Sequence, residues 1–246
     1  MSVLCIGLPT DNVGADRDPR NNAPRRKSPL IVEIVGPAGA GKTTLSQILR
    51  RRNEKILEAA DIELRRVGHL PIFAGYTPLI LPVFLRRCRP SRWFTWDEIK
   101  AIVYLKAWPR VLRRQASNND TVILLDQGPV FRLATLHAFG PDRLKSPGFD
   151  RWWDSMFKQW AFTLDVVIWL DAPATVLVER INARDKRHAV RGKSELEAHQ
   201  FLTRYRMSYE QVLAQLRAYR EPTLLQFDTG HAPVEQIADE ILASVI

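Results

Sequence analysis

Short hydrophobic runs alternate with amphipathic stretches along this chain, and the alternation predicts the fold. About five runs have the composition of short strands, and most are bounded by residues that favour turns. They lie at residues 30–35, 55–58, 121–125, 165–170 and 223–227. Because strands alternate with helices, we expect a three-layer α/β fold, a doubly wound parallel sheet with helices on both faces. Ligands are then expected at the carboxyl ends of the strands.

The amphipathic segments between these runs predict the helices. The clearest start is Thr95, because Glu98 follows it at the spacing of a capping box. This helix is expected to run to about Gln115, with a kink at Pro109. Its predicted apolar face consists of Trp96, Ile99, Val103 and Ala107. Further helices are predicted from Lys42, from Pro78, over 129–138, over 147–162, from Pro173, over 194–219 and over 233–245.

The turn after the first run has the pattern of a phosphate-binding loop. The pattern G-x-x-x-x-G-K-T is met by Gly36, Gly41, Lys42 and Thr43, between a predicted strand and a predicted helix. Glycines let backbone N–H groups converge on a phosphate, and the helix N-terminus adds its positive dipole. Lys42 is expected to reach the β- and γ-phosphates of a nucleotide, and Thr43 to bind Mg²⁺. The predicted nucleotide-binding residues are Gly36, Ala38, Gly39, Ala40, Gly41, Lys42, Thr43 and Thr44.

An acidic residue ends the third hydrophobic run. Asp126 follows a predicted strand in a chain with a phosphate loop, which is the expected position for a residue that holds Mg²⁺. The alternative is that Asp126 serves only as the N-cap of the helix that begins near Pro129. The next residue is Gln127, where many motor-type ATPases have a glutamate that activates water. Gln127 therefore argues against a hydrolytic motor.

Basic side chains are dense between Arg180 and Lys193. Arg180 and Arg184 are expected to share one face of a helix and to bind one polyanion together. Residues 184–194 have little apolar content and are predicted to form a lid, whose arginines cover the transferred phosphoryl oxygens. The predicted catalytic residues of this lid are Arg184, Arg187 and Arg191. The alternative is a solvated basic turn.

Two aromatic segments have alternative interpretations. Trp93 and Phe94 follow the basic residues of segment 86–92, which is either a solvated turn with packing aromatics or part of an acceptor-binding surface. The tryptophans of segment 147–162 are expected in the core because they recur at helical spacing, although one of them stacking on a nucleobase is the alternative. Near the end of the chain, Thr229 in a strand-to-helix turn is a candidate to flank the nucleotide base.

Composition limits the organisation of the chain. With 246 residues, 46% of them hydrophobic, residues 30–246 are enough for one α/β core. Residues 1–29 are rich in proline and basic side chains and predict a disordered N-terminal tail. Residues 1–8 are too short for the apolar region of a signal peptide, and no apolar run has the length of a membrane span. Cys5 and Cys88 form no metal-ligand pattern, so a cytoplasmic, reduced protein without zinc is expected.

The chain from residue 30 to 246 resembles the nucleoside and nucleoside-monophosphate kinase family of P-loop proteins, and is thymidylate kinase-like. The resemblance rests on the loop GPAGAGKTT, the strand end VILLDQ, the segment WLDAPATVLVERI, the basic lid and the late FDTG. It implies Mg²⁺ and ATP at the loop, Arg180 near adenine and Arg184 on phosphates. Two positions depart from the family, since thymidylate kinases usually have an acid at Ala38 and an arginine at Gln127. The Glu-Arg-Ser pattern of deoxynucleoside kinases is also absent, so the acceptor stays unassigned.

Together these features predict transfer of the γ-phosphoryl group of Mg-ATP to a small acceptor, a nucleotide, nucleoside or similar metabolite. Asp61, with Glu58 as the alternative, is the candidate base on the acceptor hydroxyl. One rival is a regulatory switch or ATPase that binds ATP or GTP, although the N-K-x-D motif of GTPases is absent. A second rival is a nucleic-acid-end kinase, which the net charge of +9 suggests but the scattered basic residues disfavour. A homodimer is left open.

Overall fold

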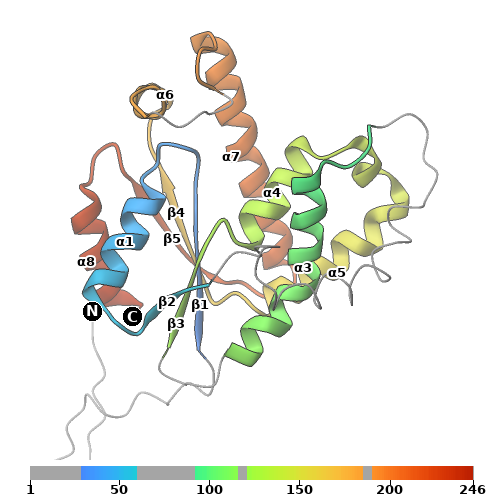
Figure 1. The fold of residues 1–246 in the computed structure, drawn as a ribbon, viewed down its shortest axis with the longest axis horizontal. Helices are drawn as coiled ribbons and strands as arrows, with labels where there is room; N and C mark the ends of the chain where they lie inside the picture. Colours follow the sequence, from blue (N-terminus) through green and yellow to red (C-terminus); the bar gives the residue numbers. More distant parts are fainter. Residues whose placement is uncertain (1–28, 60–91, 116–120, 185–189, 246) are drawn as a thin grey trace, which may run out of the picture.

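Five parallel strands form a single sheet in the order β2-β3-β1-β4-β5 (Figure 1). In this computed structural model the described residues are 29–59, 92–115, 121–184 and 190–245. The strands are β1 (Leu30–Val35), β2 (Ile56–Glu58), β3 (Val122–Asp126), β4 (Val166–Asp171) and β5 (Thr223–Asp228). β1 is central and pairs in parallel with β3 and β4. The α/β fold predicted from the hydrophobic pattern is confirmed.

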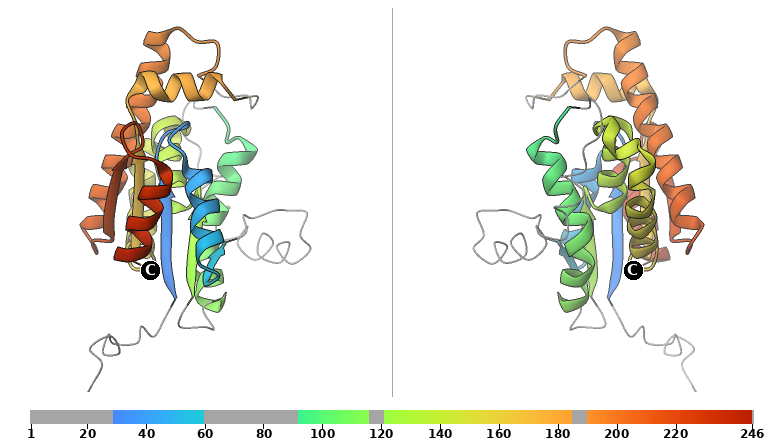
Figure 2. Two further views of the ribbon diagram at one scale, coloured as in Figure 1. Left: turned by 90° about the vertical axis from the view of Figure 1, so that its left-hand side faces the viewer. Right: turned by 90° about the vertical axis from the view of Figure 1, so that its right-hand side faces the viewer.

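Helices cover both faces of the sheet and make the outer two layers. They are α1 (Lys42–Arg52), α3 (Trp96–Gln115), α4 (Pro129–Phe139), α5 (Asp150–Ala161), α6 (Ala174–Asn182), α7 (Glu195–Arg217) and α8 (Val234–Ser244). Helices α1 and α8 lie on one side of the sheet, and α3, α4 and α5 lie on the other. The two views in Figure 2 face these layers in turn. The expected doubly wound arrangement is therefore present.

The alternation of side chains along β1 explains why both faces are buried. Ile31 and Val35 pack into the cluster formed with α3, α4, α5 and α7, whereas Val32 and Ile34 pack into the cluster formed with α1 and α8. Successive side chains of a strand point to opposite faces, so a continuous apolar run can supply two cores at once. Glu33 lies among these residues and is fully buried. Its position requires hydrogen-bond partners, which are described below.

Helix α3 begins with the predicted capping box. The Thr95 N–H donates to Glu98 Oε2 at 2.7 Å, and the Glu98 N–H donates to Thr95 Oγ1 at 3.3 Å. The helix continues past Pro109 to Gln115. The predicted apolar face is wrong at Trp96, which is 55% exposed because it is the first helical residue and lies at the rim of the layer.

Two other helix predictions need correction. The expected helix over 147–162 is a short 3₁₀ turn at Pro147–Phe149 followed by α5, and a second 3₁₀ turn lies at Asp142–Lys145. Helix α6 ends at Asn182, so Arg184 lies beyond it rather than on a shared helical face with Arg180. The helix predicted from Pro78 falls outside the described residues.

The tryptophans of α5 contribute to the core, as expected. Trp160 is buried and donates its indole N–H to the Leu105 carbonyl at 2.9 Å. Trp153 is partly buried against the same cluster and donates to the Leu144 carbonyl at 2.7 Å. Among the helices that the structure describes, none combines the length and apolar character needed to cross a membrane.

Candidate active site

The loop between β1 and α1 has a backbone that only glycine adopts readily. Gly36 has φ 141° and Gly39 has φ 86°, both in the left-handed region. A Cβ added to Gly36 would lie 2.0 Å from the carbonyl oxygen of Leu170, and one added to Gly39 would lie 2.9 Å from that of Leu177. The glycines therefore allow the loop to pass directly over the end of β4 and over α6.

Lys42, the first residue of α1, is directed back onto this loop. Its Nζ donates to the Gly36 carbonyl at 2.8 Å and to the Pro37 carbonyl at 2.9 Å. Burial lowers the pKa of Lys42 to about 8, the nearby carboxylate of Asp126 raises this pKa, and the charge of Arg184 lowers it. Asp126 and Arg184 are therefore close enough to Lys42 for their charges to change its pKa.

The N-terminus of α1 is suited to an anion. Thr43 and Thr44 lie in its first turn with exposed side chains, so both hydroxyls are accessible. The first N–H groups of a helix have no partner within the helix, and the helix dipole favours negative charge there. Binding of a phosphate at this helix N-terminus is the sequence prediction, and the exposed hydroxyls and free helix dipole end are suited to an anion.

A cavity of about 250 Å³ joins this loop to Arg180 of α6 and to Arg184, which follows α6. It is lined by Gly39, Ala40, Gly41, Thr44, Arg180, Arg184, Thr229, Ala232, Pro233 and Val234. Arg180 donates to the hydroxyl of Thr229 at 3.0 Å, to its carbonyl at 2.9 Å and to the Gly39 carbonyl at 3.4 Å. The structure thus brings together the loop, both predicted arginines and Thr229.

Two hard oxygen ligands are available for Mg²⁺. Asp126 is the last residue of β3 and pairs in register with Ile34 near the end of β1. Its carboxylate raises the pKa of Lys42. The hydroxyl of Thr43 is exposed at the start of α1. Mg²⁺ takes few protein ligands and fills its shell with waters and phosphate oxygens, so this pair fits a nucleotide-bound ion. Among the described residues no group of three or more His, Cys, Asp or Glu side chains suits a metal.

The interpretation of Asp126 as nothing more than an N-cap is wrong. Helix α4 begins at Pro129 with Gly128 as its N-cap. The N–H groups in the first turn of α4 donate to the Glu33 carboxylate, from Val130 at 2.8 Å and from Phe131 at 3.0 Å. A Cβ on Gly128 would lie 2.8 Å from the Glu33 carboxyl carbon, so the turn after Asp126 rests directly on Glu33.

Sequence reasoning missed Glu33, whose carboxylate binds the start of α4 beside the turn after Asp126. Complete burial raises the pKa of its carboxyl to about 8, and the N–H groups of Phe131 and Val130 lower that pKa. The sequence signal was a single acid inside a strand of apolar residues. Such an acid is expected to have a specific partner, but its identity requires the fold, because Val130 is 97 residues away.

A second cavity, of about 550 Å³, opens beside Gln127 on the α3 and α4 side of the strand ends. It is lined by Thr95, Asp97, Glu98, Lys100, Ala101, Gln127, Phe131, Arg132, Thr135 and Leu136. The Arg132 guanidinium lies 4.2 Å from the centre of the Tyr104 ring. Gln127, which directly follows the candidate metal ligand Asp126, is part of the wall of this cavity.

In the basic segment before Trp93, Arg92 is the one residue that the structure describes, and its side chain forms hydrogen bonds with other residues. It donates to both carboxylate oxygens of Glu98, at 2.6 and 2.9 Å, and to the Phe139 carbonyl at 2.9 Å. Phe94 is buried, whereas Trp93 is 60% exposed. The packing interpretation therefore holds for Arg92 and Phe94.

Some of the remaining predicted site residues are described by the structure, and others lie outside the described residues. Arg191 is exposed in the turn at 190–193 and is not among the residues that line the phosphate-loop cavity. Arg187 and Asp61 lie outside the described residues. Glu58 is the last residue of the edge strand β2. Ala38 is partly buried against the cluster of Ile181, Val190 and Ala198, which flanks the predicted lid.

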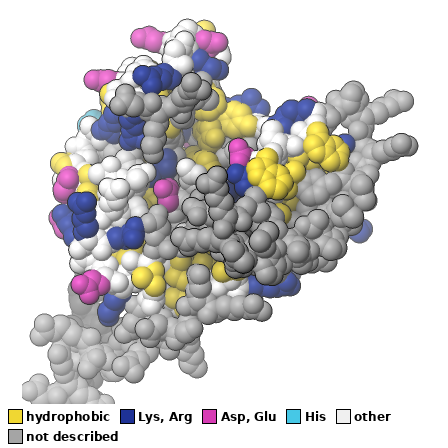
Figure 3. Space-filling model, viewed as in Figure 1, with side chains coloured by type: hydrophobic (Ala, Val, Ile, Leu, Met, Phe, Trp, Pro, Cys, Tyr) yellow, Lys and Arg dark blue, Asp and Glu magenta, His cyan; other side chains and the backbone are white. Residues whose placement is uncertain are grey.

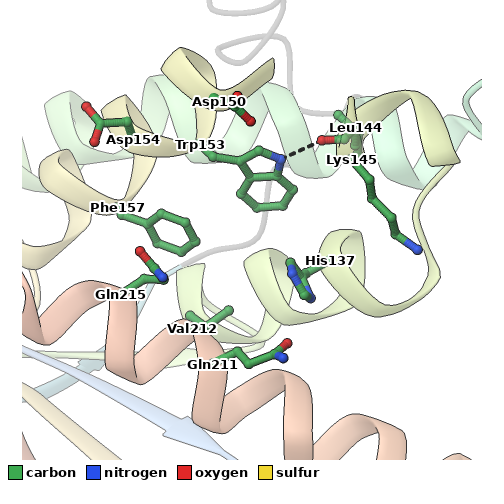
Figure 4. A pocket seen from close by; sticks show the side chains of 10 residues that line it. All are labelled: His137, Leu144, Lys145, Asp150, Trp153, Asp154, Phe157, Gln211, Val212 and Gln215. Carbon is green, nitrogen blue, oxygen red and sulfur yellow. Dashed lines mark hydrogen bonds between the residues drawn. The ribbon is translucent and has the colours of Figure 1, made fainter. Parts of the chain in front are cut away.

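A further cavity, of about 590 Å³, lies away from the strand ends. In Figure 4, Trp153 and Phe157 of α5 form one wall and Gln211 and Gln215 of α7 form the facing wall, with His137 of α4 beside them. Its lining consists of residues from α4, the Asp142–Lys145 turn, α5 and α7, without the phosphate loop. This cavity is therefore separate from the glycine loop and from Arg180 and Arg184.

Comparison with solved structures supports the fold. The chain is similar to deoxyadenosine kinase from M. mycoides with bound dCTP, with 17% identity and a TM-score of 0.50, over 88% of this chain and 100% of that one. It is also similar to thymidylate kinase from Candida albicans, with 16% identity and a TM-score of 0.51, over 88% of this chain and 90% of that one. No protein-family model matches the chain, and no curated protein matches it in sequence. At this identity the likeness establishes the three-layer α/β P-loop fold alone, as expected from the sequence.

Proposed function

We propose that the protein is a P-loop kinase that transfers the γ-phosphoryl group of Mg-ATP to a small acceptor. The observation that carries the proposal is the cavity in which the glycine loop, Arg180, Arg184 and Thr229 meet at the carboxyl end of the sheet. Ligands of open α/β sheets bind at this edge, and a glycine loop before a helix binds phosphate there. The similarity to two solved kinases is consistent with this chemistry.

The nucleotide would bind with its phosphates on the loop. Lys42 turns from the carbonyls of Gly36 and Pro37 to the phosphate oxygens, and the N–H groups at the start of α1 bind the same anion. Thr43 and Asp126 would hold Mg²⁺, which neutralises the phosphate charge. Arg180, which is hydrogen-bonded to Thr229 in the same cavity, would lie against the nucleotide base.

The acceptor would bind in the cavity beside Gln127. Its volume of about 550 Å³ suits a small metabolite, and its walls offer polar groups on Arg132, Thr135 and Lys100. Gln127 joins the two halves of the site, since it follows Asp126 and lines the acceptor cavity. Positioning and electrostatic stabilisation supply most of the catalysis in phosphoryl transfer. Arg184, Arg187 and Arg191 are proposed to cover the transferred group, and Asp61 or Glu58 to accept the proton.

The test is a screen for product. Full-length protein is incubated with Mg-ATP and single members of a panel of nucleosides, nucleotides, sugars and other metabolites, and the masses of the products are measured. A phosphorylated acceptor formed by the wild type and lost in Lys42→Ala supports the proposal. Asp61→Asn with unchanged turnover would remove only the proposed base.

Two other functions each predict a different experimental result. Release of phosphate without a phosphorylated acceptor would favour an ATPase or a regulatory switch, although Gln127 beside Asp126 disfavours it. A nucleic-acid-end kinase is suggested by the exposed Trp93, which lies 5.3 Å from the Arg143 guanidinium. On the face in Figure 3, however, basic side chains lie in separate groups among acidic ones. Strong salt dependence of oligonucleotide binding would favour that function.

Several sequence predictions stay part of this proposal. They are the disordered tail at 1–29, the single kinase-like domain at 30–246 with its lid at about 184–194, a cytoplasmic location and ATP as the donor. A homodimer stays open, and size-exclusion chromatography with light scattering would measure the oligomeric state directly.

A further inference from the structure

One turn of α7 contacts the back of the phosphate loop. Tyr209 is 0% exposed, and its hydroxyl donates to the Gly36 carbonyl at 3.3 Å. Its ring packs edge-on against Trp169 of β4, with ring centres 6.0 Å apart. The Gly36 carbonyl is also the acceptor for Lys42, so two donors from different helices share one oxygen of the loop.

The same turn of α7 reaches the loop by a second path. Arg206 makes a two-pronged ion pair with Asp171 at the end of β4, with distances of 2.7 and 2.9 Å, and donates to the Ala172 carbonyl at 2.6 Å. The Asp171 carbonyl accepts from the N–H of Thr229 at 2.8 Å and from its hydroxyl at 3.1 Å. Thr229 in turn accepts from Arg180, which donates to the Gly39 carbonyl.

We propose that Tyr209 and Arg206 are positioning residues through which α7 sets the geometry of the phosphate loop for nucleotide binding. Tyr209 acts at the first glycine of the loop, and Arg206 acts through Asp171, Thr229 and Arg180 at Gly39. The inference rests on the proposed function, because it assumes that the loop binds Mg-ATP.

The shared carbonyl explains why a tyrosine is needed. When Lys42 turns to a phosphate, the Gly36 carbonyl loses that donor. A buried carbonyl without a partner is unfavourable, and a carbonyl oxygen has two lone pairs. The Tyr209 hydroxyl keeps one hydrogen bond in place, so Lys42 can leave at a lower free-energy cost.

Tyr209→Phe tests this step, because it removes the hydroxyl and keeps the buried ring. We expect the dissociation constant for Mg-ATP, measured by titration calorimetry on the full chain, to rise by about threefold to tenfold. Arg206→Lys tests the second path to the loop, because lysine keeps the positive charge but cannot make the two-pronged ion pair with Asp171. A rise of similar size is expected there. Thermal melting of each variant without nucleotide checks that it is folded.

Arg204→Met is the matched control. Arg204 lies on the same helix, but it donates to the Ala138 carbonyl and its guanidinium lies 4.7 Å from the Phe139 ring centre, away from the loop. The variant removes a similar side chain from α7 without touching either path. Its Mg-ATP dissociation constant is expected to equal that of the wild type.

A double-mutant cycle with Lys42→Ala separates positioning from general stability. If Tyr209 acts by freeing Lys42, Tyr209→Phe weakens Mg-ATP binding in the wild type but not in the Lys42→Ala background. Equal weakening in both backgrounds, or no weakening in a folded Tyr209→Phe variant, overturns the inference while leaving the proposed function intact. A wild-type protein that binds no Mg-ATP overturns both.

Discussion

The two cavities at the carboxyl edge of the sheet are built from different parts of the chain. The smaller one is lined by the glycine loop and by Arg180 and Arg184, and Arg180 donates to the Gly39 and Thr229 carbonyls. The one beside Gln127 is walled by side chains of two amphipathic helices, α3 and α4. Backbone groups recognise phosphate in the same way in any chain that adopts the loop, whereas side chains can vary with the acceptor.

This difference explains why the sequence predicts the nucleotide-binding half of the proposed function in more detail than the acceptor-binding half. The donor side has a short sequence motif because glycine is required at fixed positions. The acceptor side has no such constraint on its backbone. Its residues are therefore expected to set specificity, and changes on the two sides should separate nucleotide binding from acceptor binding.

The largest effect is expected at the backbone of the donor side. Gly36→Ala places a Cβ 2.0 Å from the Leu170 carbonyl oxygen in a region of φ that alanine rarely adopts. We expect loss of about 3 kcal/mol or more in the free energy of unfolding, together with loss of Mg-ATP binding. Urea denaturation and calorimetry measure the two quantities.

Gly192→Ala is the control for this substitution. Gly192 also has a positive φ, of 77°, but no atom lies within 4 Å of its added Cβ. Only backbone strain of about 1–2 kcal/mol is expected there. Equal effects of the two substitutions would mean that contact with β4 does not matter for the loop.

A pH-dependent change in stability is expected from Glu33, the buried acid of β1. Since the pKa of buried Glu33 is raised from 4.5 to about 8, the folded protein holds this proton more tightly than the unfolded chain. Its contribution to the free energy of unfolding is full below pH 4.5 and is lost as pH rises through about 8. Urea denaturation between pH 5 and 8 should show this decline, and Glu33→Gln should flatten it.

Glu98, at the cavity beside Gln127, is expected to change stability with pH in the opposite direction. Burial raises the pKa of its carboxyl, but the hydrogen bonds from Arg92 and Thr95 outweigh burial and lower the pKa overall. Its contribution is therefore present above its unfolded pKa and is lost as pH falls through the lower folded value. If Glu98→Gln and Glu33→Gln change the pH profile in the same direction, the account of Glu33 is wrong.

A smaller effect is expected from the acceptor side. Arg132→Gln should raise the KM of the acceptor by about tenfold, because a charged contact is lost, without changing the affinity for Mg-ATP. Steady-state kinetics with the acceptor identified in the screen measures the first quantity, and calorimetry the second. Lys145→Gln, in the cavity of Figure 4, should change neither. Weaker Mg-ATP binding in Arg132→Gln would contradict the separation of nucleotide binding from acceptor binding.

The smallest effects are expected at the N-terminal caps of α3 and α7. Thr95 and Ser194 each form a capping box, at the start of α3 and of α7. Replacing either by alanine should lower the free energy of unfolding by about 1 kcal/mol. Thermal and urea denaturation measure this change. A much larger effect of Ser194→Ala would indicate that the start of α7 supports more than its own helix.

Local patterns predicted the sheet and the donor side because both depend on nearby residues. The glycine spacing determines the loop, and the apolar runs determine the strands within a residue or two. Glu33 and Tyr209 were harder, since their partners lie 97 and 173 residues away and become neighbours only in the fold. Arg184 was predicted at the site but on the wrong element, because the sequence does not mark where α6 ends.

The central claim is that the loop, Lys42 and the neighbouring cavity transfer a phosphoryl group to a small molecule. It is tested most directly by the mass of the product formed from Mg-ATP and the metabolite panel by the wild type and by Lys42→Ala. We predict an acceptor heavier by one phosphoryl group with the wild type, and a loss of at least about a hundredfold in rate with Lys42→Ala. Phosphorylated acceptor formed equally fast by both proteins would contradict the account.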